Sequence, residues 1–262
     1  MCFADIRIIR YFHLIVTRLP RQLCFKIPLG LYFKKRYMEE YISFEQIPFG
    51  SESFADNPEP RCPCVLLLDT SGSMGGTPIQ ELNAGIETFK QELLNDPLAT
   101  KRVEVAVVTF GPVKVESTFQ TVSNFYPRNL DASGLTPMGE AIEKGIDMIA
   151  KRKQEYKDAG IGYFKPWIIL ITDGEPTDSY YSAAIKVKDG EAGSKFAFFA
   201  IAVEDANLDI LSQISTFRAP LKLKGLLFRE FFKWLSGSLK SASSKIPGSK
   251  VNLLPPTGWA EL

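Results

Sequence analysis

Histidine is almost absent from this chain of 262 residues, which contains a single one, His13. Because His13 lies in a basic stretch at the start of the chain, a histidine-based catalytic triad or a His-ligated metal is excluded from the rest of the sequence. Cysteine is scarce as well, and no second Cys or His pair follows the C-x-C of Cys62 and Cys64 to complete a zinc site. The four cysteines are Cys2, Cys24, Cys62 and Cys64. We interpret them as reduced thiols and therefore expect a cytoplasmic protein.

Long apolar runs and nucleotide-binding loops are missing too. No stretch of about 18 uncharged apolar residues exists, so the sequence predicts no transmembrane helix. Neither G-x-G-x-x-G nor G-x-x-x-x-G-K-[ST] occurs, which argues against a dinucleotide-binding domain and excludes a P-loop NTPase. The hydrophobic content of 45% is nevertheless high enough to bury a core, so a wholly disordered chain is excluded.

Charge is unevenly distributed along the chain, although the net charge is only +1. Residues 1–37 contain eight basic residues and one acid, a net charge of +7, so the remaining residues carry −6. An acidic domain of this kind is a poor nucleic-acid binder, because phosphate neutralisation requires clustered bases. We interpret 1–37 as a basic N-terminal extension without a packed fold and suspect that Met38 is the functional start.

The rest of the sequence divides into three parts. Residues 38–60 are interrupted by proline and predict an extended lead-in. Residues 61–245 predict the folded domain, and 246–262 a proline-rich C-terminal tail. Apolar runs within the domain predict strands at 65–68, 103–110, 113–119, 167–171, 196–203 and 221–223. Helical periodicity predicts helices at 77–94, from 136, from 179, at 208–214 and at 228–239.

This alternation of strands and helices predicts an α/β fold with three layers, a doubly wound sheet that is mostly parallel. Thr77 and Thr136 each precede a proline, so we expect both to cap the helices that follow them. The run from Lys151 to Lys153 is expected to be a solvated helix face, and Glu175 and Asp178 to be solvated or capping residues.

Hard oxygen ligands follow the strands that the pattern predicts. Asp69, Ser71 and Ser73 come after the first strand, Asp173 after the fourth, and Thr136 precedes a helix between them. Ligands bind beyond the carboxyl ends of strands in such sheets, so these five residues converge if the two strands are neighbours. Two carboxylates and three hydroxyls without His or Cys are a ligand set for a hard cation such as Mg²⁺, with Mn²⁺ as the alternative.

At these residues the sequence resembles the von Willebrand factor type A (VWA) family, over about residues 61–245. The metal-ion-dependent adhesion site of that family is D-x-S-x-S followed by a later Thr and a later Asp. Here these are Asp69-Thr-Ser71-Gly-Ser73, Thr136 and Asp173. The resemblance implies a Rossmann-like VWA fold with one antiparallel edge strand at 113–119. The sequence from Asp69 to Met74 looks most like bacterial stress or tellurium-resistance VWA proteins.

The resemblance implies a metal-dependent module that binds other proteins, in a cytosolic stress-response or tellurium-resistance assembly. We expect the partner to present an Asp or Glu to the metal, and we expect neither nucleic-acid binding nor stable membrane insertion. The alternative is a phosphohydrolase that uses the same carboxylates. However, Ser71 stands where a haloacid-dehalogenase phosphatase needs its second carboxylate, and no serine nucleophile has a His or a well-placed Lys partner. We therefore expect no enzymatic activity.

Overall fold

The computed structural model of this protein describes Phe54, residues 56–249 and residues 253–261. The predicted basic extension, 1–37, and the first part of the lead-in therefore lie outside the described residues. In the described part of the chain, no helix combines the length and the apolar character that crossing a membrane requires.

A seven-stranded sheet forms the middle layer, in the order β3-β2-β1-β4-β5-β6-β7. Neighbouring strands are parallel except at the two edges, where β3 pairs antiparallel with β2 and β7 with β6. The α/β class and the antiparallel edge strand are thus confirmed, and β7 adds a second antiparallel strand. The strands are β1 (Cys62–Asp69), β2 (Val103–Phe110), β3 (Val113–Thr121), β4 (Trp167–Thr172), β5 (Ala197–Ala202), β6 (Leu221–Leu223) and β7 (Ala260–Glu261).

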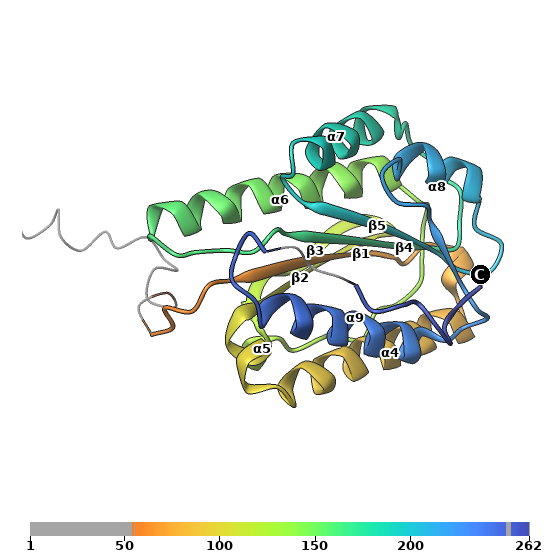
Figure 1. The fold of residues 1–262 in the computed structure, drawn as a ribbon. Coiled ribbons are helices and arrows are strands. Elements are labelled where there is room, and N and C mark those ends of the chain that lie inside the picture. The colour runs from red at the N-terminus through yellow and green to blue at the C-terminus, as the bar shows by residue number, and fades with distance from the viewer. Residues whose placement is uncertain (1–53, 55, 250–252, 262) are drawn as a thin grey trace, which may run out of the picture. The chain divides into compact units, whose positions relative to one another are not determined.

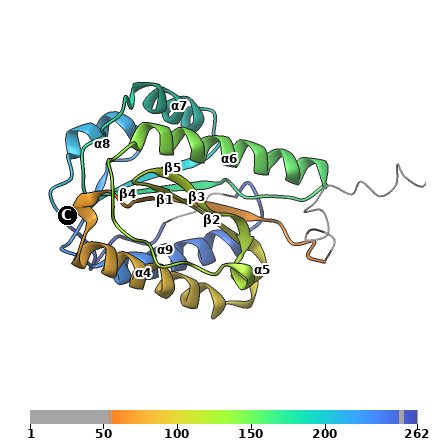
Figure 2. The same cartoon turned by 180° about the vertical axis from the view of Figure 1, so that it is seen from behind.

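Helices cover both faces of the sheet, as the two opposite views show (Figures 1 and 2). The helices α4, α5 and α9 lie on one face, and α6, α7 and α8 lie on the other. Their bounds are α4 (Thr77–Leu94), α5 (Pro97–Arg102), α6 (Met138–Asp158), α7 (Tyr181–Ala192), α8 (Leu208–Ile214) and α9 (Phe228–Ser243). Each face packs a separate apolar cluster, so the domain has three layers, as predicted.

Strand β1 is buried on both sides, which explains its continuous apolar run. Leu66 and Leu68 pack with α4 and α9, whereas Val65 and Leu67 pack with α6 and α7. Burial of such side chains stabilises the fold by about 25 cal/mol for each Å² removed from water. Because both clusters are apolar, we expect apolar burial to carry most of the folding free energy.

The helix starts differ from the prediction at both threonines. Gly76 is the N-cap of α4, which makes Thr77 the first helical residue. Helix α6 begins at Met138, after Pro137, and Thr136 does not cap it. Instead the carboxylate of Asp178 accepts from the backbone N–H of Gly139, at 3.0 Å, and of Glu140, at 2.8 Å. The first-turn donors are thus satisfied by a loop some 40 positions later, which local sequence cannot reveal.

Arg152 corrects the prediction of a solvated face from Lys151 to Lys153. Its guanidinium donates to the buried carboxylate of Glu104 at 2.8 Å. Arg61, which is fully buried, donates to Glu104 at 3.1 Å, and the phenol of Tyr156 donates to it at 2.5 Å. Phe54 lies over the two guanidiniums, 4.7 Å from that of Arg152 and 5.6 Å from that of Arg61. The arginine faces inward because Glu104 is a buried charge that needs partners.

The end of the chain is packed as well. The ring of Trp259 is buried and lies 5.0 Å from Phe231 and 5.1 Å from Trp234. The indole N–H of Trp234 donates to the carbonyl of Leu254 at 2.8 Å. The described part of the predicted tail thus lies along α9 and contributes Ala260 and Glu261 to the sheet.

Candidate metal centre

The candidate site lies where β1 and β4 end side by side, as the prediction required. These strands are parallel neighbours, with Leu68 in register with Ile171. Asp69 is the last residue of β1, and Asp173 follows the last residue of β4. The topology thus brings to one edge two carboxylates that are more than 100 positions apart in the sequence.

Asp69 is completely buried, and its carboxylate has two hydrogen-bond donors. The backbone N–H of Ser71 donates to Oδ1 at 2.8 Å, and the hydroxyl of Thr172 donates to Oδ2 at 2.5 Å. Burial raises the pKa of Asp69 above its ordinary value, although the hydrogen bonds from Ser71 and Thr172 oppose the rise. The carboxylate is therefore held in place by two neutral hydrogen-bond donors, and no positive charge among the described residues offsets its own charge.

A chain of hydroxyls connects the first loop to Asp173. The hydroxyl oxygens of Ser71 and Ser73 lie 3.0 Å apart, and that of Ser73 donates to Oδ1 of Asp173 at 2.9 Å. Burial raises the pKa of Asp173, and the nearby charge of Asp69 raises it further, whereas the hydrogen bond from Ser73 lowers it. Four of the five predicted ligands are thus linked by direct hydrogen bonds.

Thr136 reaches the same place from a third loop. A Cβ at Gly174 would lie 3.5 Å from the Thr136 hydroxyl and 3.8 Å from that of Ser73, so both hydroxyls face Gly174. The N–H of Ser133 donates to the carbonyl of Thr70 at 2.7 Å, which holds this loop against the first one. Gly111 allows the approach, because a Cβ there would lie only 2.6 Å from the Ser133 carbonyl.

These residues fit a hard cation. Asp69 is a buried carboxylate, and neither it nor Asp173 forms an ion pair with a Lys, Arg or His of the described residues. A buried charge without a partner is costly, and a cation would offset that cost. Within the described residues no group of three or more His, Cys, Asp or Glu side chains is placed to hold a metal. At this edge two carboxylates and three neutral hydroxyls would hold the ion, as Mg²⁺ sites permit.

Neighbouring residues support the site without joining it. Thr172 holds Asp69 through its hydroxyl and was not among the predicted site residues, because this contact depends on the pairing of β4 with β1. Asp178 was expected to be solvated or to cap a helix, and it caps α6. Glu175 accepts a hydrogen bond from the side chain of Asn207 at 2.8 Å, so it joins the loops that follow β4 and β5.

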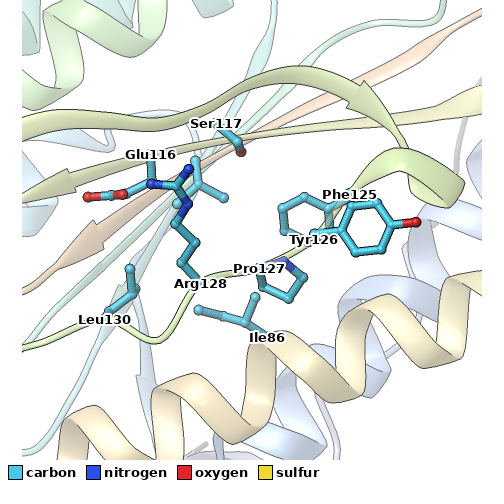
Figure 3. Close-up of a pocket in the computed structure, with 9 residues that line it drawn as sticks. Ile86, Glu116, Ser117, Phe125, Tyr126, Pro127, Arg128 and Leu130 are labelled. Carbon is cyan, nitrogen blue, oxygen red and sulfur yellow. The ribbon is translucent and has the colours of Figure 1, made fainter.

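Two hollows lie elsewhere, between α4 and residues 125–130. One is a cavity of about 20 Å³ whose lining includes Ile86, Tyr126 and Arg128 (Figure 3). That volume is enough for about one water molecule. The other is shallow and about 380 Å³ in volume, and polar side chains of α4 and the 127–129 segment line it. Neither hollow includes any of the five predicted ligands.

Comparison with known proteins identifies the family. The family model described as von Willebrand factor type A domain matches residues 64–222. No curated protein matches the chain significantly. The pilus adhesin SpaC from Lactobacillus rhamnosus GG is similar in structure, with a TM-score of 0.56 and 14% identity over 71% of this chain and 31% of that one.

Two further solved structures are similar at lower scores. Proximal thread matrix protein 1 from the mussel byssus has a TM-score of 0.47 and 20% identity, over 70% of this chain and 49% of that one. The vWF domain of the pilus tip protein Mfa5 from Porphyromonas gingivalis has a TM-score of 0.34 and 20% identity, over 45% of this chain and 39% of that one. The chain thus spans half or less of the length of these proteins. Since the family model covers more than half of the chain and the sheet has the expected order, the chain belongs to the von Willebrand factor type A domain family.

Proposed function

We propose that this VWA domain binds another protein through a Mg²⁺ ion held at the carboxyl edge of β1 and β4. The observation that carries the proposal is the buried carboxylate of Asp69, which lies in one hydrogen-bonded cluster with Ser71, Ser73 and Asp173 and has no basic partner among the described residues. Thr136 completes the set from the loop before α6. Mn²⁺ would suit the same oxygens.

Each residue has a definite task in this proposal. Asp69 and Asp173 would supply the negative charge, while Ser71, Ser73 and Thr136 would supply neutral oxygens. When bound, the ion would supply a positive charge that attracts a carboxylate, so the partner presents an Asp or Glu. Thr172 and the backbone of Ser71 position Asp69 by their hydrogen bonds, whether or not the ion is bound.

A biological setting follows from the sequence resemblance alone. The segment from Asp69 to Met74 resembles the bacterial stress and tellurium-resistance VWA proteins, which supports a place in a cytosolic assembly of that kind. The two described cysteines, Cys62 and Cys64, are free and buried, as expected of a protein kept in reducing conditions. We propose that the protein has no catalytic activity and does not bind nucleic acid.

The alternative proposal is a metal-dependent phosphohydrolase. It would need a general acid or base beside the two carboxylates. Glu175 and Asp178, in the loop after β4, have that capacity, but Glu175 is bonded to Asn207 and Asp178 to the start of α6. This geometry favours the binding function.

Metal binding by the full chain tests the proposal directly. We expect titration calorimetry to show one site for Mg²⁺ or Mn²⁺, which Asp173→Asn and Thr136→Ala weaken at least tenfold. Asp189→Asn is the matched control, because Asp189 is exposed near the C-terminal end of α7, and this variant should bind the metal normally. An unchanged affinity in Asp173→Asn would place the ion elsewhere and overturn the proposed site.

Partner binding is tested by affinity capture from the native host, with and without EDTA. The captured protein should be lost in EDTA, return with Mg²⁺ or Mn²⁺, and be lost again in Thr136→Ala. Replacement of its contacting Asp or Glu by Ala should have the same effect. A partner that stays bound both in EDTA and to Thr136→Ala would use another surface.

A further inference from the structure

Large apolar side chains are exposed around the candidate metal centre on one side. Leu135 is 70% exposed, Tyr181 is 66% exposed and Leu208 is 40% exposed. Leu135 directly precedes Thr136, and Tyr181 and Leu208 are the first residues of α7 and α8. Because these helices follow parallel strands, their starts lie at the same edge of the sheet as the site.

The segments that carry these three side chains are bonded to one another. The N–H of Thr136 donates to the hydroxyl of Thr177 at 3.0 Å, and the Asn207 side chain donates to Glu175 at 2.8 Å. Tyr181 is stacked on Tyr180, whose phenol donates to Gln213 of α8 at 3.0 Å. The segments that carry Leu135, Tyr181 and Leu208 are therefore joined by hydrogen bonds, and we name these three exposed side chains the apolar rim. Contiguous exposed apolar side chains are typical of contact surfaces.

The other side of the site has the opposite character. The exposed residues between β1 and the first turn of α4 are all small: Gly72, Ser73, Gly75, Gly76 and Thr77. Without large side chains there, a partner backbone can approach the candidate ligands closely. A partner would thus be in contact with small residues on one side and with the apolar rim on the other.

Charge adds a third and independent feature. Four segments at this edge, residues 69–77, 131–140, 172–182 and 203–209, contain acidic residues and no Lys, Arg or His, whereas Lys114 lies beside the β2–β3 turn and Lys224 directly follows β6. A divalent cation would neutralise Asp69 and Asp173 and would leave the exposed acids Glu175, Glu204 and Asp205 uncompensated. Glu204 and Asp205 form no ion pair within the described residues. A purely acidic partner would be repelled by these groups even when the metal is bound.

We propose that this edge selects a protein segment in which the metal-seeking carboxylate is flanked by basic and apolar side chains. The bases face Glu175, Glu204 and Asp205, and the apolar side chain packs on the apolar rim. This inference rests on the proposed function and adds the chemistry of the partner around the carboxylate. A bare acidic segment would satisfy the ion but not the rest of the surface.

Short synthetic peptides provide the test, with the Mg²⁺-loaded full chain as the receptor. One peptide has a central Asp flanked by Leu and Lys, the second has Glu in place of Lys, and the third has Ser in place of Leu. At low salt we expect the Lys peptide to bind about tenfold more tightly than the Glu peptide, and the difference to shrink at high salt as screening increases. Glu204→Lys with Asp205→Lys should abolish or reverse the preference. Asp189→Lys, an exposed acid on α7 outside these segments, should leave it unchanged.

The apolar contribution is tested with Leu135→Ser and Tyr181→Ser. Both variants should weaken binding of the first peptide, which contains Leu, several-fold and leave binding of the Ser peptide unchanged. Ile246 lies beyond the end of α9 and is 77% exposed, so Ile246→Ser should affect the binding of neither peptide. Mg²⁺-dependent binding without a preference between the Lys and Glu peptides would overturn this inference and leave the proposed function intact. If the peptides bound equally well with and without EDTA and still preferred Lys to Glu, the proposed metal function would be refuted, while the inferred contact surface would stand. Failure of every peptide to bind the loaded chain would also overturn the inference.

Discussion

The hydroxyl of Ser73 donates to the carboxylate of Asp173 over 2.9 Å, although 100 positions separate the two residues in the sequence. This bond links the loop after β1 to the loop after β4, so it depends on the parallel pairing of those strands. Ser73 is exposed and Asp173 is half-buried, which leaves the pair open to solvent and to a partner. The site is thus assembled by the sheet edge and lies at the surface of the domain.

Replacement of Asp69 tests whether the fold requires the charge. Asp69→Ala leaves the N–H of Ser71 and the hydroxyl of Thr172 without their acceptor, so we expect a loss of about 1–3 kcal/mol in the free energy of unfolding. The domain should remain cooperatively folded, because its core is apolar. Urea unfolding in EDTA measures the change, with Asp69→Asn as the variant that keeps an acceptor. An unfolded Asp69→Ala chain at room temperature would contradict the prediction.

The buried ion cluster at the opposite end of β1 should be far more sensitive. Glu104→Ala would leave the guanidiniums of Arg61 and Arg152 and the phenol of Tyr156 without their shared acceptor. We expect a loss of about 3–5 kcal/mol, as for other broken buried pairs. Glu155→Ala removes the more exposed partner of Arg152 and should cost less than about 1 kcal/mol. Equal losses in the two variants, measured by urea unfolding, would show that Glu104 is not the centre of the cluster.

The C-terminal segment should stabilise the domain. Trp259→Ala removes a buried ring that contacts Phe231 and Trp234, which should cost about 3–5 kcal/mol. Ile246→Ser changes an exposed apolar residue in the same part of the chain and should change stability by no more than about 0.5 kcal/mol. Thermal unfolding followed by circular dichroism compares the two. A Trp259→Ala chain as stable as Ile246→Ser would mean that the tail does not hold α9.

The buried thiols predict a pH dependence. Burial raises the pKa of the Cys62 thiol to about 12, and it raises the pKa of the Cys64 thiol as well. Below about pH 8.5 both thiols are protonated in the folded and the unfolded chain, so they do not affect stability. Above that pH the unfolded chain releases protons that the folded chain retains, so the free energy of unfolding falls as the pH rises.

Urea unfolding at neutral and at alkaline pH measures this fall. The double variant Cys62→Ala with Cys64→Ala should lose less stability over the same pH interval than the unchanged chain. Alkylation at pH 8, followed by peptide mass mapping, should modify neither residue in the folded chain and both in urea. Rapid modification of Cys62 in the folded chain would show that the thiol is accessible and that its pKa is not raised by burial.

The N-terminal extension leads to a fifth expectation. A chain truncated to begin at Met38 keeps Phe54, the first described residue that packs on the domain. Its melting temperature should equal that of the full chain within error. Phe54→Ala in the same truncated chain is the positive control, and it should cost about 3 kcal/mol because a buried aromatic ring is lost. A large drop on truncation alone would show that residues 1–37 pack on the domain.

The elements with a strong local pattern were predicted accurately. Helix α4 ends at the predicted Leu94 and begins within one residue of the predicted start, and α8 has the predicted bounds, 208–214, because apolar periodicity is a property of a short window. Short elements were missed. Helix α5 begins after Asp96, which caps it, and β7 has only two residues, so neither has a window long enough to show periodicity.

Residue type and spacings of a few positions are enough to predict the sheet-and-helix class, the closeness of Asp69, Ser71 and Ser73, and the chemistry of the candidate ligands. In contrast, packing of the whole domain places β4 beside β1, bonds Thr172 to Asp69, and makes Asp178 instead of Thr136 the cap of α6. The same packing turns Arg152 inward to Glu104. Each of these contacts joins residues about 40 to 100 positions apart. Strand order and burial select such pairs, and neither can be read from a local pattern.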